Sequence, residues 1–338
     1  MLKSPALCAT LALSLFGTFA HAADTKRQVL LIAGKPSHGP GQHEHNAGVQ
    51  LLAKCLKENA TDKVDVQFVL NGQWPEEAVL KKADSIVIYS DGGTGHPALP
   101  HLAELAAQMQ RGCGFVCLHY AVEPAFNKVG WPEPEIGADG KPLKQTPPPD
   151  RSSNGAGSPE FLQWLGGYFE QFWSVNPHWD ANFKELPKHP ISNGVNPFST
   201  NDEWYYHMRF RPGMQRVTPS LTDLPPESTT TRGESSHGGN PDQKRAVLEE
   251  KKAQHVAWAV DREDGGRGFG FTGGHFHKGW GNDEQRKLVL NAILWTANAE
   301  VPTAGVSSKL SEADLMANLD PKAPPQPKAA TVPSPAQK

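Results

Sequence analysis

Three groups of histidines each follow a short apolar run, and this spacing is the clearest sign of chemistry in the chain. The runs and the histidines behind them are 29–33 with His38, His43 and His45, 114–118 with His119, and 268–274 with His275 and His277. In an open α/β sheet, ligand sites form just beyond the carboxyl ends of the strands. We therefore expect the three groups to meet in one crevice. Imidazoles gathered in a crevice are typical of metal binding or proton transfer.

His275 and His277 are two residues apart, a spacing that places both side chains on the same side of a strand or lets them converge from a loop. Gly273 and Gly274 precede them and permit close approach of the backbone to a ligand. This spacing suits a metal ion, although a pair of histidines also arises by chance. In the first group, His38 lies nearest to the strand end and is the preferred metal ligand.

The other two histidines of the first group, His43 and His45, lie further from the strand end. Among the three histidines of this loop, His43 is the second candidate for the site, as a substrate contact, and His45 is the third. The alternative is that some of them are surface loop residues without a function. Asn46 can cap the helix that follows, and the free N–H groups of a helix N-terminus favour an anion.

A candidate acid–base residue lies in the segment 202–207. Glu203, Tyr205 and His207 share one face if this segment is extended, so Asp202 and Glu203 cannot both point inward. A carboxylate among imidazoles is a metal ligand or a general acid or base. The alternative is a salt bridge on a loop or helix.

The second half of the chain is rich in aromatic residues, which stack on the apolar faces of sugar rings or simply pack a core. Trp204 and Trp280 flank the expected site and are the best stacking candidates. The predicted site therefore consists of the metal ligands His38, His119, His275 and His277, the catalytic residues Glu203 and His119, and the substrate contacts His43, Trp204, Tyr205 and Trp280. Imidazole-rich sites suit zinc and similar divalent transition metals.

Strand-like and helix-like segments alternate along the chain. Apolar runs predict buried strands at 28–33, 64–70, 85–89, 114–118, 255–260 and 268–272. Helical spacing predicts helices over 46–59, 75–82, 100–111, 161–171 and 283–297, and residues 200–210 look extended. Two stretches rich in proline, glycine and small polar residues, 131–159 and 219–246, predict long irregular loops. The pattern indicates an α/β fold with a doubly wound, mostly parallel sheet and loop insertions.

The first 22 residues have the pattern of a secretory signal peptide. A positive start at Lys3, an apolar stretch over 6–19 and the Ala-His-Ala sequence at 20–22 are typical of one. The stretch is too short to span a membrane, so we expect an exported bacterial protein, periplasmic or secreted, without a membrane span. One domain over 23–300 and an extension over 301–338 should follow, and the proline-rich tail from about residue 320 should be disordered.

Charge and motifs exclude several partners and cofactors. Basic and acidic residues nearly balance, at 33 and 36, so nothing favours nucleic acid or an anionic membrane. No glycine motif for a nucleotide cofactor lies between a strand and a helix. Cys113 and Cys117 share one predicted strand, where their Cα atoms would be roughly 13 Å apart, too far for a disulfide.

Taken in order, these segments resemble the ThuA-like, or "trehalose utilisation", family. The matching segments are 37–48, 112–119, 166–169, 189–191, 201–205, 273–275 and 291–295. The longer, exported branch is the one resembled, because its Gly-Gly-His-Phe-His and Asp-Glu-Trp-Tyr segments are present here. The resemblance implies a flavodoxin-like fold similar to that of class I glutamine amidotransferases. In that superfamily a cysteine nucleophile sits on the turn after a central strand. His119 occupies that turn here and Cys117 comes too early, which argues against glutamine hydrolysis.

Two functions stay open at this stage. The family's association with disaccharide use and 3-keto sugars implies a small-molecule carbohydrate substrate. The first function is metal-assisted lyase, hydrolase or isomerase chemistry on a 3-keto-glycoside, in which Glu203 or His119 moves a proton. The second is a non-catalytic protein that binds a glycan or another small polar ligand in the same crevice.

Overall fold

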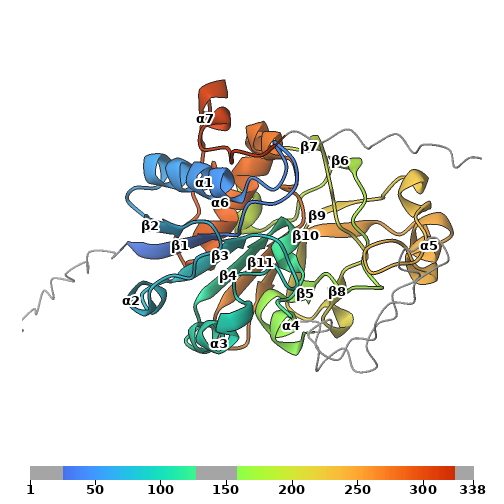
Figure 1. Cartoon of the computed structure of the whole chain (residues 1–338), viewed down its shortest axis with the longest axis horizontal. Coiled ribbons are helices and arrows are strands. Elements are labelled where there is room, and N and C mark those ends of the chain that lie inside the picture. The colour runs from blue at the N-terminus through green and yellow to red at the C-terminus, as the bar shows by residue number, and fades with distance from the viewer. Residues whose placement is uncertain (1–25, 127–157, 324–338) are drawn as a thin grey trace, which may run out of the picture.

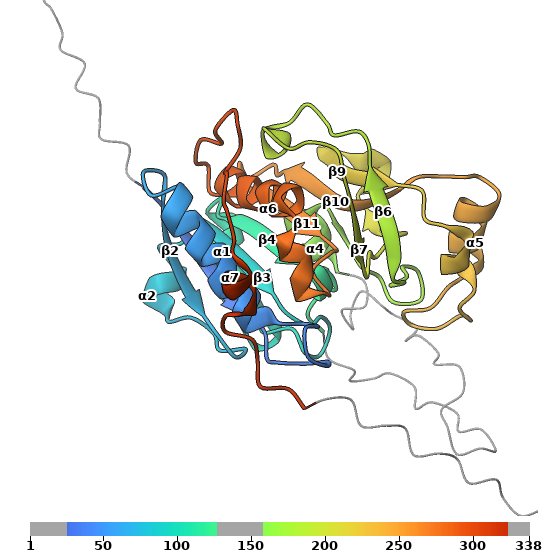
Figure 2. The ribbon, with the colours of Figure 1, turned by 90° about the horizontal axis from the view of Figure 1, so that it is seen from above.

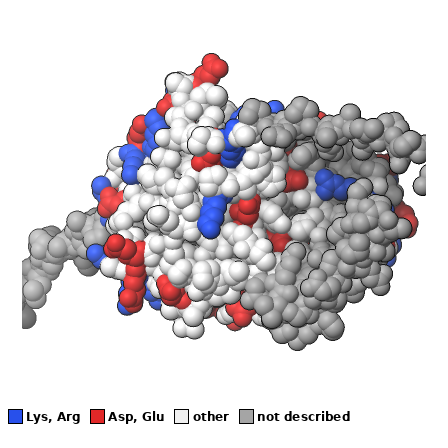
Figure 3. Space-filling model, in the orientation of Figure 1, with Lys and Arg blue, Asp and Glu red and all other residues white. Residues whose placement is uncertain are grey.

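The structure, a computed structural model, describes residues 26–126 and 158–323. The predicted signal peptide, most of the 131–159 insertion and the last part of the tail lie outside these residues. No helix in the two described ranges is long and apolar enough to cross a membrane. On the face shown in Figure 3, basic and acidic side chains are interspersed, in keeping with the near balance of charge.

The described residues form a central seven-stranded sheet (Figure 1). Its strands, in spatial order, are β2 (Val64–Val69), β1 (Arg27–Ala33), β3 (Ser85–Tyr89), β4 (Gly114–Leu118), β11 (Arg267–Phe271), β10 (Gln254–Asp261) and β9 (Val217–Asp223). The first five are parallel to one another, and β10 is antiparallel to both of its neighbours. The order of the five parallel strands is that of a flavodoxin-like sheet. Their carboxyl ends therefore share one edge.

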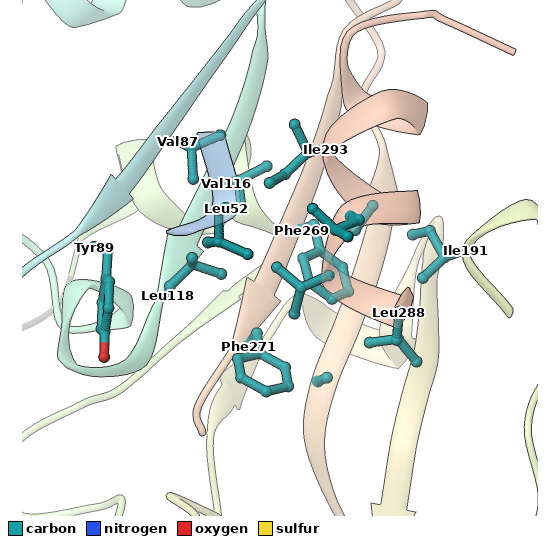
Figure 4. Packing of buried hydrophobic residues seen from close by; sticks show 14 of the residues in the cluster. Leu52, Val87, Tyr89, Val116, Leu118, Ile191, Phe269, Phe271, Leu288 and Ile293 are labelled. Atoms are coloured by element: carbon teal, nitrogen blue, oxygen red, sulfur yellow. The ribbon is translucent and has the colours of Figure 1, made fainter. Parts of the chain in front are cut away.

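Helices cover both faces of the sheet. On one face lie α1 (His45–Asn59) and α6 (Asp283–Thr296), which Figure 2 shows side by side. On the other lie α2 (Glu77–Leu80), α3 (Leu102–Gln110) and α4 (Pro159–Leu165). Successive strand residues alternate between the two cores. Leu118 packs with Leu52, Phe269 and Ile293 on the α1 and α6 face (Figure 4), whereas Cys117 packs on the opposite face.

The remaining elements are short. Two antiparallel pairs lie outside the main sheet: β5 (Gly167–Tyr168) with β8 (Arg209–Phe210), and β6 (Trp179–Phe183) with β7 (Phe198–Asp202). The other helices are α5 (Pro241–Leu248) and α7 (Glu312–Met316), and the 3-10 turns are η1 (Leu99–His101), η2 (His119–Val122), η3 (Pro190–Ser192), η4 (Pro212–Met214), η5 (Glu227–Thr230) and η6 (His277–Gly281).

The predicted strands of the main sheet are confirmed, each within a residue of its expected bounds. The predicted helix over 161–171 is wrong in its second half. Gly166 adopts φ +77° and ends α4, because a glycine in the left-handed region terminates a helix at little steric cost. The chain then enters β5. Extended structure over 200–210 is likewise interrupted, since β7 ends at Asp202.

The loop predicted over 219–246 is also wrong, because it contains most of β9 and the start of α5. Pro219 is typical of a loop and led to the wrong prediction for this segment. A proline is tolerated in β9 because β9 is an edge strand, where the missing N–H removes no essential hydrogen bond of the sheet. The side chain of Asn240 caps α5 by accepting the N–H of Gln243, and Pro241 occupies the first helical position. Residues 320–323 are the described start of the predicted proline-rich tail, and Asp320 and Lys322 contact the body of the protein there.

Candidate functional site

Four side chains from distant segments form a buried cluster at the carboxyl edge of the sheet. His43 follows β1, His119 follows β4, Glu203 follows β7 and His275 follows β11. One ligand atom from each lies within 4.8 Å of the others. The three histidine groups thus meet as the strand-end argument predicted, and each contributes one ring to this histidine–glutamate cluster.

Most neighbouring atoms of the histidine–glutamate cluster are about 3 Å apart. His43 Nε2 is 3.0 Å from both His119 Nε2 and His275 Nδ1. Glu203 Oε2 is 3.1 Å from His275 Nδ1 and 3.7 Å from His119 Nε2. The hydroxyl of Tyr205 lies 3.2 Å from His119 Nε2 and 3.3 Å from Glu203 Oε2. All five side chains therefore converge on one point.

The hydrogen bonds on the far side of two rings fix where their protons lie. His119 Nδ1 donates to the carbonyl of Thr272 at 2.9 Å, and His43 Nδ1 donates to the Asp91 carboxylate at 2.6 Å. The Nε2 atoms of both rings are then lone-pair acceptors, although they face each other at 3.0 Å. Burial lowers the pKa of both imidazoles well below the usual range, so neither is protonated at neutral pH. A cation held between the two nitrogens would relieve this arrangement.

Asp91 is a site residue that the sequence analysis missed. It lies two residues after β3 and accepts the hydroxyl of Ser37 at 3.0 Å as well as the His43 ring. A carboxylate that holds the second nitrogen of a histidine is the usual outer partner of a metal ligand. Its position just beyond a predicted strand was the signal that could have identified it.

Backbone geometry aims the ligands. His119 adopts φ +56° in the first residue after β4, and His43 adopts φ +45°. Positive φ is costly for a residue with a side chain and is typically retained at functional sites. The loop of His275 is held by Asp202, whose carboxylate accepts the N–H groups of Gly274 at 2.7 Å and His275 at 2.9 Å. Asp202 thus supports the backbone of this loop and is not a member of the cluster, and burial raises its pKa to about 6.

Other predicted ligands lie outside the histidine–glutamate cluster. His38 is exposed at the rim, with its ring centroid 3.6 Å from that of His43, and forms a second possible ligand group with His43 and Asp91. His277 is buried but is not a member of either group. The two-residue spacing failed because β11 ends at Phe271 and His277 begins the turn η6. His207 stacks on Trp173 instead, since the extended segment stops at Asp202.

The aromatic candidates divide differently from the prediction. Trp204 and Trp280 have no exposed surface and pack in the core against Phe271. Neither ring therefore offers a face to a sugar in this structure. The prediction failed because a sequence rich in aromatic residues does not show which of them are buried. Tyr205 is also buried, but its hydroxyl reaches the cluster.

A buried carboxylate paired with a partly exposed imidazole beside the cluster was also missed. Glu123, 1% exposed, accepts the N–H of His237 at 2.8 Å and that of Gln171 at 2.6 Å. The hydroxyl of Tyr120 is 2.9 Å from His237 Nε2, and its ring packs edge-on against that of His43. Glu123 and His237 lie 114 residues apart on irregular segments, so no local pattern links them.

The sequence profile of the ThuA family, described as trehalose utilisation, matches residues 28–296. The chain belongs to the ThuA family. It is similar to a ThuA-like protein from Bacteroides uniformis, at 15% identity and a TM-score of 0.49, over 84% of this chain and 95% of that one. It is also similar to one from Parabacteroides merdae, at 18% identity and a TM-score of 0.44, over 85% and 94%. A search of curated proteins gives no match.

In this ThuA family member, the turn after β4 carries an imidazole. His119 occupies the strained first position of that turn. Cys117 lies two residues earlier, within β4, with no exposed surface. Burial raises the pKa of its thiol well above the usual range, so the thiolate is disfavoured. Cys117 therefore has no access to a substrate, and the side chain on the turn after β4 is that of His119.

Proposed function

We propose that this ThuA family member binds a divalent transition metal ion through His43, His119 and His275, with Glu203 beside it. The observation that carries the proposal is the pair of lone-pair nitrogens that face each other at 3.0 Å while Asp91 and the Thr272 carbonyl hold their other sides. Neutral imidazoles with a nearby carboxylate suit zinc and its transition-metal neighbours, whereas magnesium and calcium prefer oxygen ligands.

We further propose that the protein acts on a carbohydrate derivative, with a 3-keto-glycoside as the leading substrate class and lyase, hydrolase or isomerase chemistry as the reaction. The family description supports the carbohydrate class. A bound metal ion supplies a Lewis acid that polarises a carbonyl oxygen. Glu203 is the cluster member that extends toward solvent, since its side chain is 11% exposed against 0% for His119. The polarised carbonyl acidifies the C–H bond next to it. We therefore assign Glu203 as the base that removes this proton.

The surroundings of Glu203 suit this role. Its Oε1 accepts an N–H from Asn176 at 3.3 Å and lies 3.6 Å from the exposed ring of His178. Its Oε2 faces the Tyr205 hydroxyl, which can hold or return a proton. Two polar partners at the rim and one inside thus orient the carboxylate. The signal-like first 22 residues support export to the periplasm or medium, which we propose as the location.

The test combines metal analysis with turnover. Protein purified without chelators or an affinity-tag metal should contain a transition ion and gain thermal stability with added zinc, and His119→Ala should lose both. Wild-type protein that contains no ion and shows no shift with zinc contradicts the metal centre. A metal-loaded protein that binds glycans but does not turn over any 3-keto disaccharide supports the non-catalytic binding function instead.

A further inference from the structure

The C-terminal segment reaches the loop that carries His43. Lys322 donates through Nζ to the main-chain carbonyls of Gln42 and, at 3.2 Å, His43. The same ammonium lies 3.2 Å from Glu44 Oε1, and the two side chains are only 7% and 0% exposed. A buried ammonium with a carboxylate and two carbonyls around it is fully engaged. Lys322 therefore packs against the loop that carries His43.

Asp320 engages the same loop two residues earlier. Its main-chain N–H donates to Glu44 Oε2 at 2.8 Å, and its side chain accepts the amide of Asn46 at 2.8 Å. The other oxygen of Glu44 accepts the N–H of Gly41 at 2.8 Å. Glu44 thus lies between two site-loop histidines as a buried carboxylate, and the C-terminal segment supplies a cation and an N–H to it. A buried carboxylate deprived of such partners is left unpaired and must regain contact with water.

The main chain of His43 is held from both sides. Its N–H donates to the carbonyl of His275 at 2.9 Å, which ties it to the second ligand loop, and its carbonyl accepts from Lys322. The residue also keeps the unfavourable φ of +45°. Such a conformation persists only where the surroundings fix it. Release of Lys322 would free one side of this peptide and expose Glu44 to water, so the ring of His43 would lose its alignment.

We propose that Asp320 and Lys322 are positioning residues for the metal centre, which they serve by neutralising Glu44 and fixing the backbone of His43. This inference rests on the proposed metal function, and its consequence is that the affinity for zinc depends on a segment close to the C-terminus. Loss of an outer partner of a metal ligand lowers metal affinity about 10- to 100-fold.

The test compares two truncations of the full chain. Removal of residues 324–338 leaves both contacts and should leave the zinc dissociation constant, measured by competition with a chromogenic chelator, unchanged. Removal of residues 320–338 should weaken zinc binding about tenfold or more. Lys322→Met should do the same within an otherwise complete chain. Lys54→Met is the matched control, because Lys54 contacts Asp314 of the same C-terminal extension but not the loop, and it should bind zinc like wild type.

Further measurements separate positioning from general stability. Glu44→Gln removes the buried charge, so Lys322→Met should cost less zinc affinity in that background, and additive losses would contradict the pairing. A merely structural role would lower the urea midpoint of the metal-free protein and leave zinc affinity intact, which would overturn the proposal. If wild type binds no zinc, the metal centre is wrong. Amide exchange over residues 41–46 then tests the contact by itself: acceleration on removal of 320–338 shows that the C-terminal segment holds the His43 loop, and unchanged rates refute even that.

Discussion

The contact between Asp91 and His43 offers the sharpest test of the metal centre. We expect Asp91→Asn to weaken zinc binding while the fold is retained. The substitution keeps the shape of the side chain but replaces a charged acceptor, 2.6 Å from His43 Nδ1, with a neutral amide. The imidazole of His43 is then less basic. Its Nδ1 can also accept an N–H from the new amide, and the ring proton then lies on Nε2, the atom that should bind the metal.

The size of the effect follows from the exposure of Asp91. Loss of an outer carboxylate costs about 10- to 100-fold in metal affinity. The side chain of Asp91 is 26% exposed, so solvent screens part of its charge. We therefore expect the lower end of the range, about tenfold, equivalent to about 1.4 kcal/mol.

The assay is competition between the protein and a chromogenic chelator for zinc, at neutral pH and moderate salt. Asp62→Asn is the control, because this carboxylate is 76% exposed and its contact is with Lys63. It should bind zinc like wild type. Unchanged affinity in Asp91→Asn would refute the reasoning that Asp91 fixes the tautomer of His43. Unchanged affinity in His43→Ala as well would remove His43 from the ligand set.

Three further outcomes are expected. Glu203→Gln should retain its fold by circular dichroism and lower turnover of a 3-keto disaccharide by about 100-fold, the usual scale for loss of a general base; full activity would disprove that role. Cys117→Ala should keep zinc binding and turnover and lose stability on the order of 1 kcal/mol in urea unfolding, because the thiol only fills core space; a folded but inactive variant would reinstate the thiol as nucleophile. Burial lowers the pKa of His96 to about 4, so its contribution to stability is complete above pH 6.5 and falls as the pH drops toward 4, by about 3 kcal/mol in all. Urea midpoints measured over this range should fall less steeply for His96→Asn, and identical slopes would contradict the assignment.

Local sequence patterns determined every strand of the main sheet except β9, and much of the site's location. Continuous apolar runs predict strands buried on both faces, and parallel strands must end at one edge. This reasoning was sufficient to place His119 and His275 together, because each follows its strand closely. Strand alternation does not account for Glu203 and Asp202, because β7 ends at Asp202 and Glu203 lies beyond the extended segment.

Only the tertiary structure decided which groups complete the site. His43, rather than His38, enters the cluster because the loop turns through positive φ and pairs with a loop 232 residues away. The engagement of Lys322 with Glu44 was likewise hidden, since a proline-rich tail has the composition of a disordered one. Periodicity reports only which face of its own element a residue occupies. Contacts between irregular segments depend on the packing of the whole chain, so the sequence located the edge of the sheet where the site lies, and the fold selected its residues.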